Sequence, residues 1–369
     1  MVLAKLKTRS LLSNRRADCT KYAYDTEGKT IGWKYQDQTR ATQAYDAVGQ
    51  RTKIQDWTGR YTYSFDAVGR TLLASDSFAK RITYAYDAVG QRAKMREPDG
   101  GRFTYWYDGV GQITRLLNPF QENTTFTYDV AGRRTMQKLA NRVRASYSYD
   151  AADRLTTLAN VRADGTYVSK YDYAYDNTMN KTRVIEADAD RVTWSYDTTY
   201  QLTRERRSGA NAYDTTYTYD AAQNRRLMID SGARTTYTCD AVNQLNWFQD
   251  NSGRTTFSYD NNGNQTLQID PTLTRTTNLW DGNNCMVRVI RGSSINSTYL
   301  YDSSRRMVES SLQGDVSHFT LDRYDCLIDT DISGATYAAY TNDISMPFNL
   351  LCEQRGRVQI LPWRFCWVN

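Results

Sequence analysis

The chain has 369 residues, of which 29 are tyrosine and only ten are phenylalanine, and its mean hydropathy is −0.71. A doubly wound enzyme needs strands built from runs of valine, isoleucine and leucine, so this composition argues against that class and favours many half-buried strands. The 47 basic and 41 acidic residues are interspersed and leave a net charge of +6, which is typical of a solvated surface and predicts no nucleic-acid partner.

Residues 1–20 precede the first repeated motif and form a predicted N-terminal lead-in. The apolar pieces Val2–Ala4 and Leu11–Leu12 are separated by lysine and arginine residues, so the segment lacks the continuous apolar stretch of a classical signal peptide. The sequence also contains no uninterrupted apolar run of about 18 residues, and it therefore predicts no membrane span.

An aromatic residue followed by aspartate recurs through most of the chain, with Phe, Cys or Trp replacing Tyr at three places. The aspartates are Asp25, Asp46, Asp66, Asp87, Asp108, Asp129, Asp150, Asp176, Asp197, Asp220, Asp240, Asp260, Asp281 and Asp302. These 14 positions span 302 − 25 = 277 residues in 13 steps, a mean of about 21 residues per step. The regular period predicts a repeat array over residues 21–322.

Each repeat has the pattern of a β-hairpin. The residues before each aspartate alternate between aromatic and Thr or Ser, as in Tyr61–Asp66 and Phe103–Asp108, which predicts a strand with one buried face. A glycine three residues after the aspartate suits a left-handed turn position, and Asn243, Asn284 or Asp153 replaces it elsewhere.

The aspartate side chain of each turn is expected to accept hydrogen bonds from the amides of that turn. The predicted structural turn residues are Asp46, Gly49, Asp66, Gly69, Asp87, Gly90, Asp108, Gly111, Asp129, Gly132, Asp260 and Gly263. One aspartate per turn supplies too few oxygens for a calcium site, so no metal site is predicted. Leucine-rich repeats have a similar period, but their regularly placed leucines are missing.

The predicted fold class is all-β, made of repetitive antiparallel hairpins. At about 4.8 Å per strand, 14 hairpins would form a ribbon on the order of 130 Å long. Because strand twist prevents so long a flat sheet, we expect the array to coil into a spiral sheet or closing shell.

Three of the turns carry the closest likeness to a known family. Tyr45–Arg51, Tyr86–Arg92 and Tyr128–Arg134 resemble the YD repeats of RHS proteins, and the resemblance extends from about Tyr24 to Asp302. It implies a β-sheet that spirals into a hollow cocoon, as in bacterial polymorphic toxins, wall-associated proteins and the teneurin adhesion receptors. In toxin members the shell encloses a C-terminal effector domain that is released by autoproteolysis.

The C-terminal part departs from that family pattern. Residues 323–339 resemble a degenerate form of the core-closing segment, in which the turn Asp331–Gly334 is the clearest remnant. Residues 340–369 form an unassigned tail of 30 residues. The only Asp-Pro pair, Asp270–Pro271, lies inside a repeat turn, so the sequence does not predict self-cleavage.

Few residues are candidates for chemistry. The single histidine, His318, has no sequence partner that would make it a catalytic base, and we predict no catalytic residue, no enzyme activity and no cofactor. The cysteines show no CxxC pair and are expected to be single packed residues. They are Cys19, Cys239, Cys285, Cys326, Cys352 and Cys366.

The tyrosines and arginines allow two interpretations. Inward tyrosines could line a wide lumen filled by water or cargo, which their hydroxyls favour, or form a face that binds sugar or protein. Arg133–Arg134 and Arg206–Arg207 are expected to form a solvated edge that discourages pairing with another sheet.

The sequence therefore predicts a non-catalytic RHS/YD-repeat structural module, part of an encapsulating or surface-exposed β-shell associated with secreted toxin or wall-associated proteins. The alternative is an extracellular adhesion or carbohydrate-binding repeat protein. The partners expected are a toxin or cargo domain, or a cell-surface glycan or protein, together with self-association through open sheet edges. The family resemblance implies an extracellular or cell-surface location.

Overall fold

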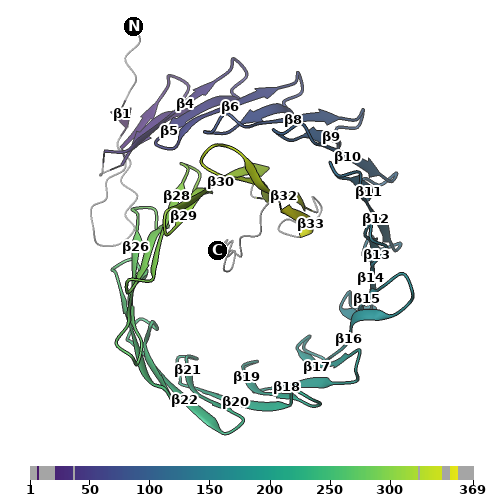
Figure 1. Cartoon of the computed structure of the whole chain (residues 1–369), viewed down its shortest axis with the longest axis vertical. Helices are drawn as coiled ribbons and strands as arrows, with labels where there is room; N and C mark the ends of the chain where they lie inside the picture. Colours follow the sequence, from purple (N-terminus) through teal and green to yellow (C-terminus); the bar gives the residue numbers. More distant parts are fainter. Residues whose placement is uncertain (1–5, 8–20, 36–37, 323–324, 343–349, 356–369) are drawn as a thin grey trace. The chain divides into compact units, whose positions relative to one another are not determined.

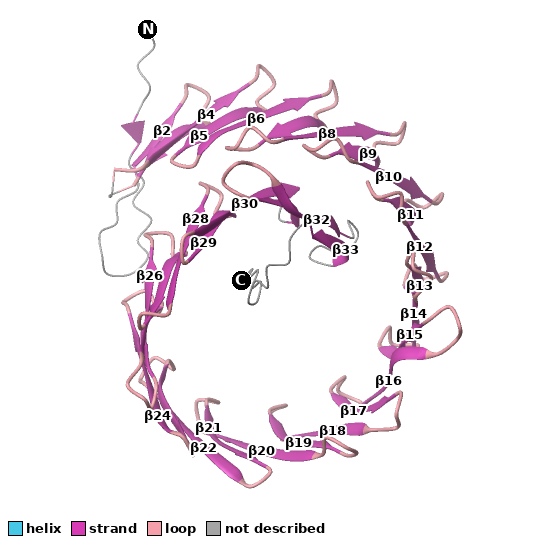
Figure 2. Ribbon diagram, in the orientation of Figure 1, coloured by secondary structure: helices cyan, strands magenta, loops and turns pink. Residues whose placement is uncertain are grey.

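The computed structural model describes residues 6–7, 21–35, 38–322, 325–342 and 350–355 (Figure 1). Every regular element in these ranges is a β-strand, and strands that follow one another within a unit pair antiparallel (Figure 2). The predicted all-β fold of repetitive hairpins is confirmed. None of the described residues belongs to a helix that could cross a membrane. Most of the predicted lead-in and most of the unassigned tail, namely residues 343–349 and 356–369, lie outside the described ranges.

The chain divides into two compact units, whereas the sequence suggested one array followed by a tail. Unit 1 comprises residues 1–102, 280–288 and 295–369. Its strands are β1 (Leu6–Lys7), β2 (Lys21–Tyr24), β3 (Thr30–Lys34), β4 (Arg40–Tyr45), β5 (Arg51–Asp56), β6 (Gly59–Phe65), β7 (Thr71–Ser75), β8 (Arg81–Tyr86), β9 (Arg92–Arg96), β28 (Ile295–Tyr301), β29 (Met307–Leu312), β30 (Asp315–Asp322), β31 (Asp325–Thr330), β32 (Thr336–Asn342) and β33 (Leu350–Arg355).

Unit 2 comprises residues 103–279 and 289–294. Its strands are β10 (Arg102–Tyr107), β11 (Ile113–Leu117), β12 (Asn123–Tyr128), β13 (Arg134–Lys138), β14 (Arg144–Tyr149), β15 (Leu155–Val161), β16 (Tyr167–Tyr175), β17 (Lys181–Glu186), β18 (Arg191–Tyr196), β19 (Leu202–Arg207), β20 (Tyr213–Tyr219), β21 (Arg225–Asp230), β22 (Ala233–Cys239), β23 (Leu245–Asp250), β24 (Gly253–Tyr259) and β25 (Gln265–Ile269). The strands β26 (Arg275–Trp280) and β27 (Met286–Arg291) are divided between the units.

Each repeat is an antiparallel hairpin with a bulge at its aromatic residue. In the β12–β13 hairpin, Thr127 pairs with Met136, and the register then shifts so that Tyr128 pairs with Arg134. The same shift precedes the ladder aspartate in the other hairpins of both units, for example at Tyr45 and at Tyr259. We call the turn that begins at a ladder aspartate an Asp turn, and the turn at the opposite end of the strands a distal turn.

Period-two burial in the strands agrees with the sequence prediction of one covered face. In β8, Ile82 is buried while Arg81 and Thr83 are exposed, and Tyr84 and Tyr86 are half-buried. Farther along unit 2 fewer apolar side chains are buried. Strands β19 to β25 contain no fully buried apolar side chain, and their half-buried rings pack on one another, with Phe248 between Tyr237 and Phe257 at centroid distances of 6.2 and 5.9 Å.

Unit 1 contains a contact between hairpins that are far apart in sequence. Three successive distal turns of β5 to β10 each place a carboxylate on the later hairpins. Asp56 Oδ2 accepts a hydrogen bond from the Ser303 amide at 2.9 Å, and Asp76 Oδ2 accepts one from Thr320 Oγ1 at 2.9 Å. Asp99 accepts a hydrogen bond from the hydroxyl of Thr336. We call this row of contacts the seam.

A buried ion pair lies at the centre of the seam. Arg92 of β9 pairs with Asp322 of β30, both side chains are about 11% exposed, and the guanidinium also stacks over the Tyr84 ring at 4.9 Å. The Tyr84 hydroxyl donates to Asp322 Oδ1 at 2.9 Å. Because both charges are largely shielded from water, removal of one partner leaves the other without compensation.

Asp322→Ala should therefore destabilise unit 1 by at least about 3 kcal/mol, since a buried guanidinium loses its counter-ion. Thermal unfolding followed by circular dichroism should show a lower melting temperature, and hydrogen exchange should speed up in β8, β9 and β30. The matched control is Asp214→Ala, which removes the partner of Arg204 in an exposed pair and should cost less than about 1 kcal/mol. Equal losses in the two variants would contradict a structural role for the seam pair.

Candidate functional site: the Asp-turn edge

The ladder aspartates cap their own turns, as the Asp129 turn illustrates. The Gly132 amide donates to the Asp129 carbonyl at 3.0 Å, and the Asp129 amide donates to the Arg133 carbonyl at 2.9 Å. The carboxylate oxygen Oδ1 accepts from the amides of Ala131 at 3.0 Å and Arg133 at 2.9 Å. All predicted turn residues lie in this arrangement, namely Asp46, Gly49, Asp66, Gly69, Asp87, Gly90, Asp108, Gly111, Asp129, Gly132, Asp260 and Gly263.

The fourth residue of each Asp turn has a left-handed backbone, with φ of +82° at Gly132. Asn243, Asn284 and Asp153 adopt the same conformation, in keeping with their tolerance of positive φ. Sequence reasoning missed four further positions where the residue type disfavours it: Met179, Tyr200, Gln223 and Arg305, with φ between 61° and 70°. At these positions the hydrogen bonds of the turn hold a conformation that the side chain alone would not choose.

At eight Asp turns the tyrosine before the aspartate connects its hairpin to the preceding one. Tyr128 donates its hydroxyl hydrogen to the Ile113 carbonyl at 2.8 Å, and Tyr149 donates to the Arg134 carbonyl at 2.9 Å. Tyr45, Tyr86, Tyr175, Tyr196, Tyr219 and Tyr259 make the equivalent bond. These hydroxyls therefore donate to backbone carbonyls of the preceding hairpin, a role that the sequence interpretations of the tyrosines did not include.

After three of the Asp turns an arginine reaches forward to the next hairpin. Arg133 Nη1 donates to the Asp150 carbonyl at 3.1 Å and to Asp153 Oδ1 at 2.7 Å, and its guanidinium stacks over Tyr149 at 4.8 Å. Arg70 stacks in the same way over Tyr86, and Arg154 over Tyr175. We call the tyrosine bond and this forward contact together the clasp.

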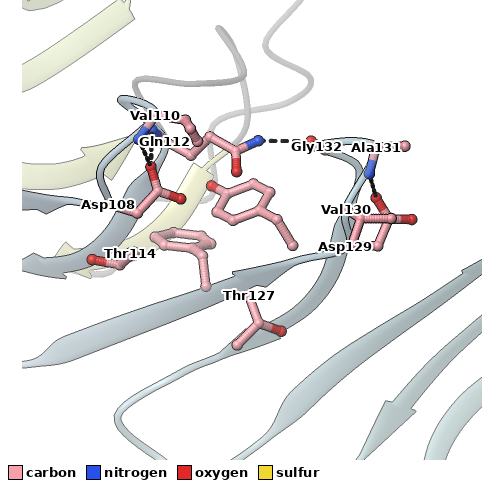
Figure 3. A pocket seen from close by; sticks show the side chains of 11 residues that line it. Asp108, Val110, Gln112, Thr114, Thr127, Asp129, Val130, Ala131 and Gly132 are labelled. Carbon is pink, nitrogen blue, oxygen red and sulfur yellow. Dashed lines mark hydrogen bonds between the residues drawn. The ribbon is translucent and has the colours of Figure 1, made fainter.

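A depression of about 640 Å³ lies between the Asp108 and Asp129 turns of unit 2. Val110, Phe126, Tyr128 and Val130 supply its apolar lining, and Gln112 crosses its rim to donate to the Gly132 carbonyl at 2.9 Å (Figure 3). The two aspartates keep their carboxylates on their own turns, so the depression presents an apolar surface framed by backbone.

His318 and Asp270, the residues that the sequence analysis considered for catalysis and self-cleavage, interact with neighbouring side chains and amides. His318 stacks on Phe78 with ring centroids 4.0 Å apart, and its Nε2 lies 3.2 Å from Glu309 Oε2. Asp270 caps a distal turn through the amides of Thr272 and Thr274.

The cysteines follow the expectation of single residues as far as they are described. Cys239, Cys285 and Cys326 are not in disulfides and lie in half-buried positions. Cys19 and Cys366 lie outside the described residues, as does the side chain of Cys352.

The expected solvated role is wrong for Arg134. Its side chain is buried, and its guanidinium lies 4.5 Å over the Phe126 ring. Arg207 pairs with Glu186 and Asp190 on the sheet. The period of the strands places both arginines on the covered face, where cation–π contact and ion pairing replace hydration.

One buried carboxyl group does not belong to a ladder aspartate. Glu97, at a distal turn of unit 1, has its pKa raised to about 7, first by burial and then by the charge of Asp99. Within the described part of the chain, histidine, cysteine and acidic side chains form no group of three that could hold a metal ion.

Part of the chain matches a known family. The RHS Repeat family model matches residues 107–144, which contain the Asp108 and Asp129 turns and the clasp between them. The predicted resemblance is confirmed, and the chain carries RHS (YD) repeats. No curated protein matches the sequence.

Several solved structures resemble the fold at low sequence identity. TcdB2-TccC3-Cdc42 aligns with a TM-score of 0.50 at 14% identity, covering 92% of this chain and 23% of that chain. TcdB2-TccC3-TEV aligns with a TM-score of 0.45 at 14% identity, covering 90% and 24%, and the Photorhabdus luminescens Tc holotoxin pore with 0.37 at 13%, covering 91% and 25%. The chain thus spans less than a quarter of the first of these proteins.

Asp129→Ala should destabilise the β12–β13 hairpin by about 1–2 kcal/mol, because two amides and the Arg133 guanidinium lose their acceptor. Hydrogen exchange measured by mass spectrometry should accelerate across residues 129–133. Val130→Ala, at a fully exposed position in the same turn, is the matched control and should change the stability by less than about 0.5 kcal/mol. Identical exchange in the two variants would show that the carboxylate does not hold the turn.

The Asp turns should also set the acid limit of stability. Hydrogen bonds from Arg133 lower the pKa of Asp129, and a hydrogen bond from the backbone of Arg154 lowers that of Asp150. A carboxylate with a lowered folded pKa stabilises the fold above its unfolded pKa, near 3.9, and this stabilisation is lost as the pH falls through the folded value. We expect the melting temperature to fall steeply below about pH 4. A melting temperature that stays constant down to pH 2 would be inconsistent with these caps.

Proposed function

We propose that the chain is a non-catalytic RHS-type structural module that forms part of the wall of a β-shell, outside the cell or at its surface, and works with a secreted toxin or wall-associated protein. The observation that carries the proposal is the clasp, whose tyrosine bond recurs at eight Asp turns and joins each of those hairpins to the preceding one. An array held by such nearest-neighbour contacts extends a wall one sheet thick, because each repeat needs only its neighbours.

The polar side chains are engaged in hydrogen bonds and stacking contacts within the sheet, which supports a structural role. The ladder carboxylates accept amides of their own turns, and the only histidine is stacked on Phe78. A catalytic acid, base or nucleophile has to be free to meet a substrate. Groups engaged in capping and stacking stabilise the sheet instead.

The aromatic side chains favour a wall over a carbohydrate-binding face. Sugar binding requires an uncovered ring face, but Arg115 stacks over Trp106 at 4.3 Å and Arg254 over Trp247 at 4.2 Å. One face of each indole ring is thus occupied by a guanidinium from the same sheet. The resemblance to RHS repeats, whose toxin members enclose a C-terminal effector domain, supports a toxin or cargo domain as the partner to test first.

Shielding of an attached domain tests the wall function. A small fluorescent domain fused directly after Asn369 should be digested by trypsin several-fold more slowly than the free domain, because the sheet restricts access of the protease. The control carries the same domain on a flexible linker of about 60 residues, whose reach of roughly 40 Å lets the domain leave the wall. Equal digestion with the short and the long connection, while the repeats stay intact, would refute shielding by this chain.

A further inference from the structure

The seam of unit 1 shows how a distal turn binds an Asp turn. Trp57, in the distal turn that begins at Asp56, donates its Nε1 hydrogen to the Tyr301 carbonyl at 2.8 Å. Asp56 Oδ2 accepts from the Ser303 amide, while Asp56 Oδ1 accepts from the Thr58 amide of its own turn at 2.9 Å. Asp302, which begins the bound Asp turn, is only 3% exposed. One carboxylate therefore caps its own turn and binds another at once.

The bound group is the amide directly after the ladder aspartate, which points out of an Asp turn. At the Asp108 and Asp129 turns of unit 2, which the structure describes in full, the corresponding amides of Gly109 and Val130 have no protein acceptor. These two turns thus present the same outward donor that Ser303 presents in the seam, but without a partner.

Apolar side chains stand beside these free amides. Val110 is 82% exposed and Val130 is 110% exposed, and both line the depression between the two turns (Figure 3). Val48, Val68 and Val89 are similarly exposed on consecutive Asp turns of unit 1. Val130 is the second residue of its turn, whereas the other four valines are the third residue of theirs. Single exposed apolar residues are ordinary, but exposed valines on successive Asp turns form a stripe, which is typical of an interaction surface.

Unit 2 also carries an unbound counterpart of the Asp56 turn. Asp250 pairs with Gly253 across a two-residue distal turn, as Asp56 pairs with Gly59, and both glycines have positive φ. Asp250 Oδ1 accepts from the Ser252 amide at 2.8 Å, which leaves Oδ2 without a protein donor. The exposed Asn251 occupies the place of Trp57 and carries an amide that can donate to a carbonyl in the same way.

We propose that the Val110–Val130 edge of one chain binds the Asp250–Gly253 distal turn of a second copy. Asp250 Oδ2 accepts the outward amide of Gly109 or Val130, and the two valines lose their contact with water. Successive Asp turns and successive distal turns are both two strands apart, roughly 9.6 Å, so neighbouring turns along the two edges can engage in register.

A second copy is the occupant because one chain carries both halves of the contact and already joins such halves in its own seam. The two surfaces differ, so the contact is heterologous, and a complex of two copies leaves one edge of each kind free. Association by turn edges also differs from pairing through open strand edges, which the sequence predicted. The proposal does not depend on cargo, so shielding and association can fail independently.

Sedimentation equilibrium of the purified chain between about 1 and 100 µM tests the proposal. The average mass should rise with concentration above the 42.5 kDa of one chain. Val110→Asp combined with Val130→Asp places charges on the edge and should weaken association at least tenfold. Asp250→Asn keeps an oxygen for the cap but replaces the second acceptor with a donor, and it should weaken association to a similar degree.

Complementation of the two variants gives the sharpest readout. The valine variant keeps an intact distal turn and the Asp250→Asn variant keeps an intact Asp-turn edge, so their equimolar mixture should form a complex that stops at two chains. Val168→Asp, at a valine that is 51% exposed on β16, is the matched control and should associate like the unaltered chain. Circular dichroism and melting temperature verify that each variant is folded.

Three results would overturn the proposal. The first is an unaltered chain that stays monomeric over the whole concentration range. The second is association that the edge variants leave unchanged, which would assign it to strand edges. The third is a mixture of the two edge variants that associates no better than either variant alone.

Discussion

The structure depends on one constraint: every hairpin must be closed by a turn whose polar groups are satisfied within the turn and its neighbours. The ladder aspartate meets this constraint by accepting two amides of its own turn, and the tyrosine before it donates to the previous hairpin. A thin sheet has little buried apolar surface, particularly from β19 to β25, so these edge contacts carry more of the coupling between repeats than they would in a domain with a deep core.

Much of this arrangement follows from the sequence because its causes are local. Asp and Gly three residues apart specify a turn with a left-handed fourth residue, and period-two aromatics specify the covered face. The strands, the antiparallel hairpins and the RHS resemblance were predictable on these grounds. The left-handed conformations of Met179 and Tyr200 were not, since the repeat imposes them against the preference of the residue.

The remaining features depend on groups that are distant in sequence. Tyr128 reaches a carbonyl 15 residues upstream, and Trp57 reaches one 244 residues downstream. No local pattern encodes such partners. In the seam, the carboxylates of Asp56 and Asp76 accept hydrogen bonds from groups of other hairpins, whereas similar carboxylates elsewhere only cap their own turns. An aspartate carboxylate can therefore close its own hairpin and also bind another hairpin when one lies next to it.

The central claim is that adjacent repeats are coupled energetically through the clasp. A double-mutant cycle between Arg133→Ala and Tyr149→Leu measures this coupling directly, because the guanidinium of one repeat stacks over the ring of the next. Unfolding free energies of the four proteins should give a coupling of about 0.5–1 kcal/mol, the range of a partly exposed cation–π contact. Strictly additive losses would contradict the account, since the two hairpins would then be stabilised independently of each other.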